Sequence, residues 1–283
     1  MSHTSLIPVA DLAAHRHDPA WIVFDCRHDL ARPEAGPGEY AEGHLPDAHF
    51  LHADHDLAGP RNGKNGRHPL PTVEALVATL SRFGVDGSKQ VIAYDAQGGM
   101  MAARLWWMLR WLGHDRVAVL DGGLQQWVAA GHSLSIETPR PVPARFTPSP
   151  RGLMVDAAFV QAQIGADRTV VIDARAADRY RGENETLDPV GGHIPGARNR
   201  PFRDNLDADG RFKPAERLRA EYGSLLGALG PDQTIHSCGS GVSACHNLLA
   251  MAVAGLPGGR LYAGSWSEWC ADPRRPVAVG PTP

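Results

Sequence analysis

Short apolar runs rich in β-branched residues recur along the chain and alternate with segments of helical pattern. Four of these runs read WIVFD, QVIAYD, RTVVID and QTIHS, and each has the length and composition of a buried strand. Helical patterns lie between them; Thr72 is placed to cap the segment TVEALVATLSRF, and Gly84 follows its end. This alternation predicts an α/β fold of parallel sheets with helices on both faces.

Four sequence blocks occur twice, in the same order. VFDCR and GHLPDA in the first half correspond to VIDAR and GHIPGA in the second; Asp25 precedes His44 by 19 residues, and Asp173 precedes His193 by 20. Downstream, VIAYDAQGG corresponds to TIHSCGSGV, and VLDGGLQQW corresponds to LYAGSWSEW. Two copies indicate a duplicated domain rather than a solenoid. The histidines occupy equivalent places in both copies, so we expect them to be structural.

A proline-rich segment lies between the two copies. Residues 139–150 contain five prolines in twelve positions, and such a segment is extended and cannot continue a helix. We therefore expect an N-terminal domain over residues 1–138, a linker over 139–150 and a C-terminal domain over 151–283. A length of 283 residues suits two domains.

Composition excludes several classes of protein. Lys and Arg total 28 against 31 for Asp and Glu, and without a basic run there is no nucleic-acid footprint. No apolar stretch approaches the roughly 20 residues of a membrane helix, and the N-terminus shows no secretory pattern. Four cysteines are too few for a disulfide scaffold, so we expect free thiols in the cytoplasm.

Cys238 is the residue best placed for chemistry. It directly follows the strand candidate QTIHS, the next three residues include two glycines, and a helical pattern starts near Val242. Such a loop lies at the carboxyl edge of the sheet, where its amides and the helix N-terminus favour an anion. We expect Cys238 to be a reactive thiolate rather than a core cysteine. Cys26 and Cys245 lie within elements and are expected to be structural, and Asp95, at the equivalent place, marks the first copy as scaffold.

With these motifs the chain resembles the tandem-domain rhodanese sulfurtransferases. The loop CGSGVSA resembles the CGSGVTA loop of the 3-mercaptopyruvate branch, and GHIPGA and GSWSEW extend the resemblance over essentially the whole chain. It implies two rhodanese-like domains, an inactive N-terminal one and a catalytic C-terminal one, with the active site in the interdomain cleft. It further implies a persulfide on Cys238 and no metal or organic cofactor.

The resemblance also assigns roles to side chains. Ser240 is expected to act with His68 and Asp54 in acid-base catalysis, and Arg179 is expected to bind the donor carboxylate. The loop residues implied in substrate binding are Gly239, Gly241, Val242 and Ser243. The family's second carboxylate-binding arginine falls on Asp188, which removes half of the expected clamp. Arg181 is a nearby candidate replacement, and Asp188→Arg is expected to tighten carboxylate binding.

The implied reaction moves sulfur from 3-mercaptopyruvate to cyanide or a thiol, such as thioredoxin or a low-molecular-weight thiol. Thiosulfate is the alternative donor, although Gly239 and Ser240 lack the cationic side chains of the CRKGVT loop typical of that branch. A non-catalytic sulfur carrier is a second alternative. A phosphatase would need an arginine where the chain has Ala244.

The segment HFLHADHD is a candidate metal site. It contains His49, His52 and His55 beside two aspartates, which are residue types that bind Zn²⁺. In an extended segment alternate residues face opposite ways, so the three histidines should not converge. We therefore expect no metal. The tryptophans of RLWWMLRWLG are expected to pack in the core.

Overall fold

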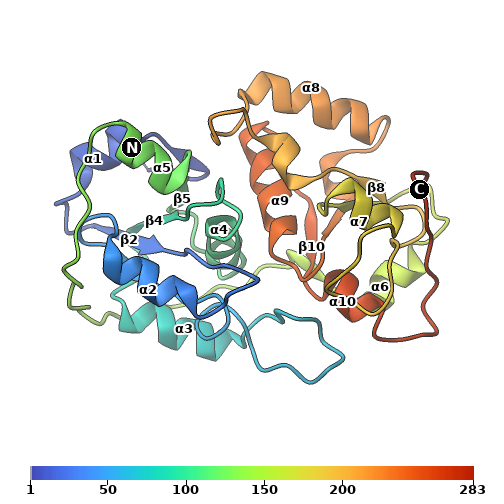
Figure 1. The fold of residues 1–283 in the computed structure, drawn as a ribbon, viewed down its shortest axis with the longest axis horizontal. Helices are drawn as coiled ribbons and strands as arrows, with labels where there is room; N and C mark the ends of the chain where they lie inside the picture. The colour runs from blue at the N-terminus through green and yellow to red at the C-terminus, as the bar shows by residue number, and fades with distance from the viewer. Residues whose placement is uncertain (1) are drawn as a thin grey trace. The chain divides into compact units, whose positions relative to one another are not determined.

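The computed structural model describes residues 2–283, which fold into two compact units (Figure 1). The first unit comprises residues 2–59, Pro71–Arg151 and Ala208–Phe212, and the second comprises Pro60–Leu70, Gly152–Asp207 and Lys213–Pro283. A division at one linker, as expected from the sequence, therefore needs a correction: each unit takes up a short segment from the other half of the chain. None of the helices in residues 2–283 has the length and apolar character needed to cross a membrane.

The predicted linker lies along the first unit. The backbone N–H of Ala144 donates to the carbonyl of Ser81 at 2.9 Å, and that of Ser149 donates to the carbonyl of Leu112 at 2.8 Å. Residues 139–150 are accordingly extended, without helix or strand, and they count with the first unit rather than standing between two domains.

The first unit is built on a five-stranded parallel sheet with the order β1-β5-β4-β2-β3. Its strands are β1 (Leu6–Ile7), β2 (Trp21–Asp25), β3 (His49–Phe50), β4 (Gln90–Tyr94) and β5 (Val117–Leu120). Its helices are α1 (Val9–His15), α2 (Ala35–Glu42), α3 (Val73–Arg82), α4 (Ala102–Trp111) and α5 (Gly123–Ala129). The Thr72 side chain caps α3 by accepting from the N–H of Ala75 at 3.2 Å, as predicted.

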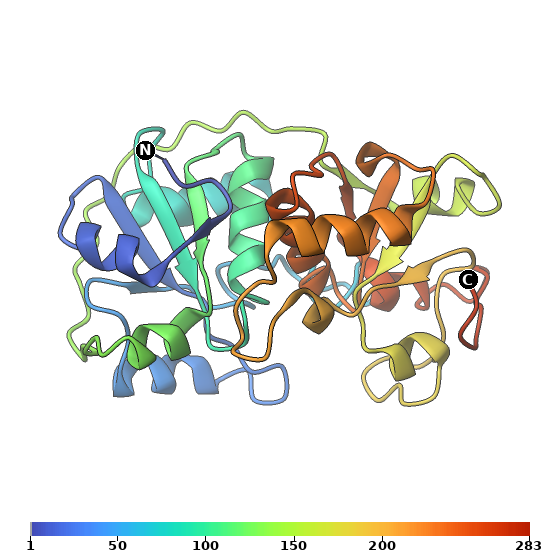
Figure 2. The same cartoon turned by 90° about the horizontal axis from the view of Figure 1, so that it is seen from above.

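The second unit repeats this architecture with the order β6-β10-β9-β7-β8. Its strands are β6 (Met154–Val155), β7 (Val170–Asp173), β8 (Arg198–Asn199), β9 (Thr234–Ser237) and β10 (Arg260–Tyr262). Its helices are α6 (Ala157–Ala162), α7 (Ala177–Arg181), α8 (Ala215–Leu226), α9 (Ser243–Val253) and α10 (Ser265–Trp269), with short 3₁₀ turns η1 (Phe202–Asn205) and η2 (Pro231–Gln233). Helices lie on both sides of each sheet (Figure 2). The predicted duplication and α/β fold are confirmed.

The aspartate and arginine of the two repeated strand blocks form the same buried ion pair. Arg27 Nη2 lies 2.7 Å from Asp25 Oδ2, and Arg175 Nη2 lies 2.6 Å from Asp173 Oδ2. In both units the same Nη2 also donates to the glycine carbonyl of the following GHxP block at 2.7 Å. The block therefore fixes the end of a strand to the turn beyond it.

His44 and His193 make equivalent contacts in the two units. Each stacks on a tyrosine, Tyr40 or Tyr180, with 3.8 Å between ring centroids. Each Nδ1 is hydrogen-bonded to the carbonyl of that same tyrosine, at 2.8 Å and 2.9 Å respectively. Because both histidines are fully buried and share these contacts, they tie turns to helices, as the repeat predicted. The tryptophans of α4 are also buried, as expected.

Glu221 on α8 offers a test of the second unit's stability against pH. It accepts hydrogen bonds from Arg200, Lys213 and Arg217. Burial raises its pKa, but these three cations outweigh burial and lower the pKa to about 2. The carboxylate therefore stabilises the fold above its ordinary pKa of about 4.3, and the stabilisation is lost as the pH falls from there toward 2.

We expect Glu221→Gln to lower the free energy of unfolding at pH 7 by about 1–2 kcal/mol, after allowance for the partial exposure of Glu221. Urea denaturation between pH 7 and about pH 2.5 is the measurement. The deficit should shrink below about pH 4, and Glu216→Gln, on an exposed face of the same helix, is the control. A deficit that stayed constant with pH would contradict this account.

Candidate active site

The loop between β9 and α9 wraps the sulfur of Cys238. The N–H of Gly241 donates to Cys238 Sγ at 3.1 Å. Gly241 has a φ of +77°, and a Cβ atom there would lie 2.3 Å from the carbonyl oxygen of Ala263, so only glycine fits. Cys238 is 2% exposed. The other cysteines that sequence analysis assigned to the core are buried too, and burial raises the pKa of Cys26.

Helix α10 holds this loop from the other side. The N–H of Trp266 donates to the carbonyl of Cys238, and that of Ser267 donates to the carbonyl of Gly239, both at 3.0 Å. Ser265 Oγ accepts the N–H of Cys238 at 3.1 Å and lies 4.0 Å from its Sγ. These bonds fix the backbone around the thiol.

Ser265 was missed by the sequence analysis. It has a φ of +52°, which is rare for residues other than glycine. The repeat aligns it with Gly123, whose φ is +57°. The second copy therefore accepts a strained serine where the first copy has glycine, and the hydroxyl contacts the Cys238 backbone. The serine in place of glycine at this position of the repeat is the sequence signal that could have indicated Ser265.

The equivalent loop of the first unit encloses a carboxylate. Asp95 is fully buried and follows β4 as Cys238 follows β9. Its two oxygens accept four backbone N–H groups at 2.7–3.0 Å, from Gln97, Gly99, Met101 and Ala102. A strand-to-helix loop of this fold can therefore surround a carboxyl group with main-chain donors, although burial outweighs these donors and raises the pKa of Asp95.

Ser240 and His68 lie together beside the thiol. His68 Nδ1 and Ser240 Oγ are hydrogen-bonded at 2.8 Å, and both residues are buried. His68 belongs to Pro60–Leu70, the segment that joins the second unit. Asp54 lies in the first unit, with its Oδ2 3.9 Å from His28 Nε2. The structure thus brings Ser240 and His68 into contact, and the catalytic roles of Ser240, His68 and Asp54 stay predictions.

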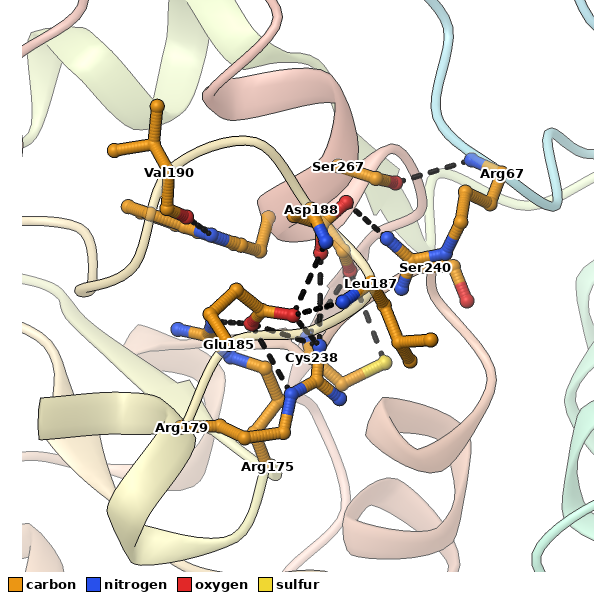
Figure 3. Close-up of polar contacts among 12 residues, drawn as sticks. Arg67, Arg175, Arg179, Glu185, Leu187, Asp188, Val190, Cys238, Ser240 and Ser267 are labelled. Carbon is orange, nitrogen blue, oxygen red and sulfur yellow. Dashed lines mark hydrogen bonds and ion pairs between the residues drawn. The ribbon is translucent and has the colours of Figure 1, made fainter. Parts of the chain in front are cut away.

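Two guanidinium groups lie over the loop (Figure 3). A Cβ atom on Gly239 would lie 2.8 Å from Arg67 Nη2 and 3.6 Å from both Nη atoms of Arg179. Arg67 Nη1 forms an ion pair with Asp188. Arg179 Nη2 lies 2.8 Å from Glu185 Oε1 and 3.6 Å from Asp188 Oδ2. Burial raises the pKa of Glu185, but the charge and hydrogen bond of Arg179 and the N–H groups of Leu187 and Asp188 together outweigh burial, so the pKa is lowered.

The histidines of HFLHADHD are divided between two places. His49 is on β3, and its ring contacts those of Phe24 and Phe83. The ring centroids of His52 and His55 lie 4.2 Å apart. One donor atom each of His28, His52 and Asp54 lie within 4.8 Å of one another, a spacing that could hold a metal. However, His52 Nδ1 accepts the N–H of Asp54 at 3.1 Å, which places the proton of the neutral ring on Nε2. This arrangement disfavours a metal at that nitrogen.

Comparison with known proteins identifies the family. A family model described as Rhodanese-like domain matches residues 8–130 and 156–272. The chain belongs to the rhodanese family. It is 48% identical to the protein named "Probable 3-mercaptopyruvate sulfurtransferase" of Pseudomonas aeruginosa, over 99% of this chain and 100% of that protein. It is 36% identical to the thiosulfate sulfurtransferase of Bos taurus, over 82% and 78% of the two chains.

A solved rhodanese structure agrees with the fold. The crystal structure of SseA from Escherichia coli, described as a 3-mercaptopyruvate sulfotransferase, matches 93% of this chain and 99% of its own, with 30% identity and a TM-score of 0.81. Because these relatives are sulfurtransferases, the chain is an enzyme of the same kind, a sulfurtransferase.

Asp188 plays a different part in this rhodanese from the one expected. Its carboxylate is 3% exposed and pairs with Arg67 rather than facing an incoming carboxylate. Arg181, the candidate replacement, pairs with Glu183 at the surface at 2.7 Å. Asp188→Arg would place a third guanidinium against Arg67 and Arg179 and remove the charge that balances them. From these ion pairs we now expect Asp188→Arg to weaken carboxylate binding rather than to tighten it.

Proposed function

We propose that this sulfurtransferase takes sulfur from 3-mercaptopyruvate onto Cys238 and passes it to a thiol or to cyanide. The observation that carries the proposal is the hydrogen bond between His68 and Ser240, of which Ser240 lies in the same loop as the thiol. Breaking the C–S bond of mercaptopyruvate generates a carbanion that must be protonated, whereas thiosulfate releases sulfite, which needs no proton on carbon. A proton-transferring pair at this place suits the first donor.

The first half-reaction forms one bond and breaks another. The Cys238 thiolate attacks the donor sulfur, an S–S bond forms, and the C–S electron pair leaves as the enolate of pyruvate. Ser240, hydrogen-bonded to His68, delivers the proton that converts the enolate to pyruvate. Arg179 holds the donor carboxylate, and we propose that Asp54 supports the charge of His68. The product on the enzyme is a Cys238 persulfide.

The second half-reaction releases the outer sulfur. A thiolate or cyanide attacks it, the S–S electron pair returns to Cys238, and the thiolate is regenerated. The backbone N–H groups of Gly239, Gly241, Val242 and Ser243 are proposed to stabilise the persulfide anion. Asp95 supports this role, since the related loop of the first unit surrounds a carboxyl group with four N–H groups.

We propose a cytoplasmic thiol as the acceptor, either thioredoxin or a low-molecular-weight thiol. The four cysteines are all free, which suits a reducing compartment. Thiosulfate is the second candidate donor. It is favoured by the two guanidinium groups over the loop, which would also attract a dianion, and by the name of the bovine relative.

Ser240→Ala and His68→Gln test the choice of donor. We expect each to lower kcat for mercaptopyruvate by about 100-fold, the low end of general acid catalysis, because the enolate loses its proton donor. The rate with thiosulfate should change by less than about threefold, since no carbon is protonated. Pyruvate release and sulfite release are the measurements, and each variant serves as its own control. An equal loss with both donors would contradict the proposal.

A further inference from the structure

The second unit contains a cavity at the edge of its sheet opposite Cys238. The cavity has a volume of about 470 Å³ and is lined by the end of α6, the start of β7 and the segment that follows α8. Cys238 comes after the carboxyl end of β9, which runs parallel to β7, so the length of the strands separates the cavity from the thiol. Its volume falls within the range of roughly 300–1,000 Å³ that is usual for small-molecule sites.

Aromatic rings occupy the corresponding edge of the first unit. Trp21, the first residue of β2, stacks on His15 of α1 with 4.6 Å between ring centroids. Phe83, which follows α3, packs against His49, the first residue of β3, with 5.2 Å between ring centroids. The first unit therefore covers the amino-terminal edge of its sheet with side chains of its own.

The second unit has smaller or charged side chains at the same positions of the repeat. The strand registers and the repeated blocks align the two sheets residue by residue. The equivalents of His15, Trp21, His49 and Phe83 are Gln163, Thr169, Arg198 and Leu226. All four of these residues line the cavity. The cavity thus lies where the first unit places its rings.

Arg198 brings a positive charge to this cavity. Its Nη1 donates to the carbonyl oxygens of Leu225 and Leu226 at the end of α8, the latter at 3.2 Å. These bonds fix the guanidinium group, which carries five N–H donors in all. Within residues 2–283, no carboxylate pairs with Arg198, and its Nε and Nη2 have no acceptor. The free donors of a fixed guanidinium suit a carboxylate, which they bind by charge-assisted hydrogen bonds.

We propose that this cavity binds a small aromatic carboxylate. The ring would lie against the apolar wall that includes Val160, Ile164 and Leu229, and the carboxylate would bind Arg198. The aromatic part follows from the first unit, in which an indole, a phenyl and two imidazole rings take the equivalent place. The carboxylate follows from the unpaired cation. The site is independent of the sulfur-transfer reaction proposed above, so either inference can fail without the other.

Indole-3-acetate and its neutral counterpart indole-3-acetamide are the probes, and isothermal titration calorimetry measures their binding. We expect indole-3-acetate to bind the wild type with a Kd of about 0.1 mM. The amide should bind about 10-fold more weakly, because it lacks the charge that Arg198 recognises. Arg198→Gln should remove this difference, so that the Kd values of the two probes lie within about threefold of each other.

Thr169→Trp tests the position of the site. It gives the second unit the ring that the first unit has at Trp21, and it should weaken binding of both probes at least about 10-fold by filling the cavity. Urea denaturation checks that the variant still unfolds cooperatively. Its mercaptopyruvate turnover should stay within about threefold of the wild-type value, because the cavity lies at the opposite edge from the thiol.

Arg179→Gln is the matched control, because it removes a guanidinium over the Cys238 loop and should leave the affinity for indole-3-acetate unchanged. A loss of affinity in this variant would place the probe at the thiol and overturn the proposal. Wild-type protein that bound neither probe at millimolar concentration, or a folded Thr169→Trp that bound both as the wild type does, would also overturn it. A 10-fold preference for the acid that persisted in Arg198→Gln would do the same, whether or not Thr169→Trp folds.

Discussion

Cys238→Ser is expected to lower kcat/KM for mercaptopyruvate at least about 1,000-fold, equivalent to ~4 kcal/mol of transition-state stabilisation. A serine hydroxyl stays protonated near neutral pH and cannot carry sulfur as a persulfide. The Gly241 N–H that contacts the sulfur at 3.1 Å would then bind an uncharged oxygen. Pyruvate release measures the rate, and intact-protein mass spectrometry after donor addition should show one added sulfur on the wild type and none on the variant.

Cys245→Ser is the matched control for this experiment. Cys245 lies seven residues further along, on α9, and its Sγ donates to the carbonyl of Gly241 at 3.4 Å. A serine hydroxyl can make the same bond, so the variant should keep turnover within about threefold. If Cys238→Ser kept more than about a tenth of the wild-type rate, a covalent intermediate at this position would be excluded.

Asp95→Ala is expected to lower the free energy of unfolding by about 3 kcal/mol, because it leaves four buried N–H groups without an acceptor. Asp95→Asn should cost less, since its amide keeps one carbonyl oxygen for two of these donors. Urea denaturation measures both. The rate of sulfur transfer by the folded fraction should stay at the wild-type value, because Asp95 belongs to the unit without the thiol. A variant as stable as the wild type would show that the loop holds its shape without an anion.

Local patterns predicted the architecture well. The strand runs, the cap at Thr72 and the turn at Gly84 depend on residues that are neighbours in the sequence, and their period and composition carry the information. The repeat predicted equal sheets, and both have the same strand order. The Ser240–His68 pair was reached through the resemblance to the rhodanese family, since 172 residues separate its members.

The contacts that the sequence did not predict depend on the paths of the loops. The ion pair of Arg67 with Asp188 joins two loop segments, and neither residue belongs to a periodic pattern. Arg67 reaches Asp188 because the segment Pro60–Leu70 belongs to the second unit. The path of such a loop follows from tertiary packing rather than from local propensity. The ion-pair partner of Asp188 lies 121 residues away, so no local sequence pattern could predict it.

The carboxylate of Asp95 bears on how many sulfur atoms one polypeptide can carry. The side chain of Asp95 occupies the inside of that loop, so the loop has no room for a sulfur-containing anion, and it has no thiol at the position of Cys238. We therefore expect mass spectrometry to find one transferable sulfur per polypeptide, carried by the second unit.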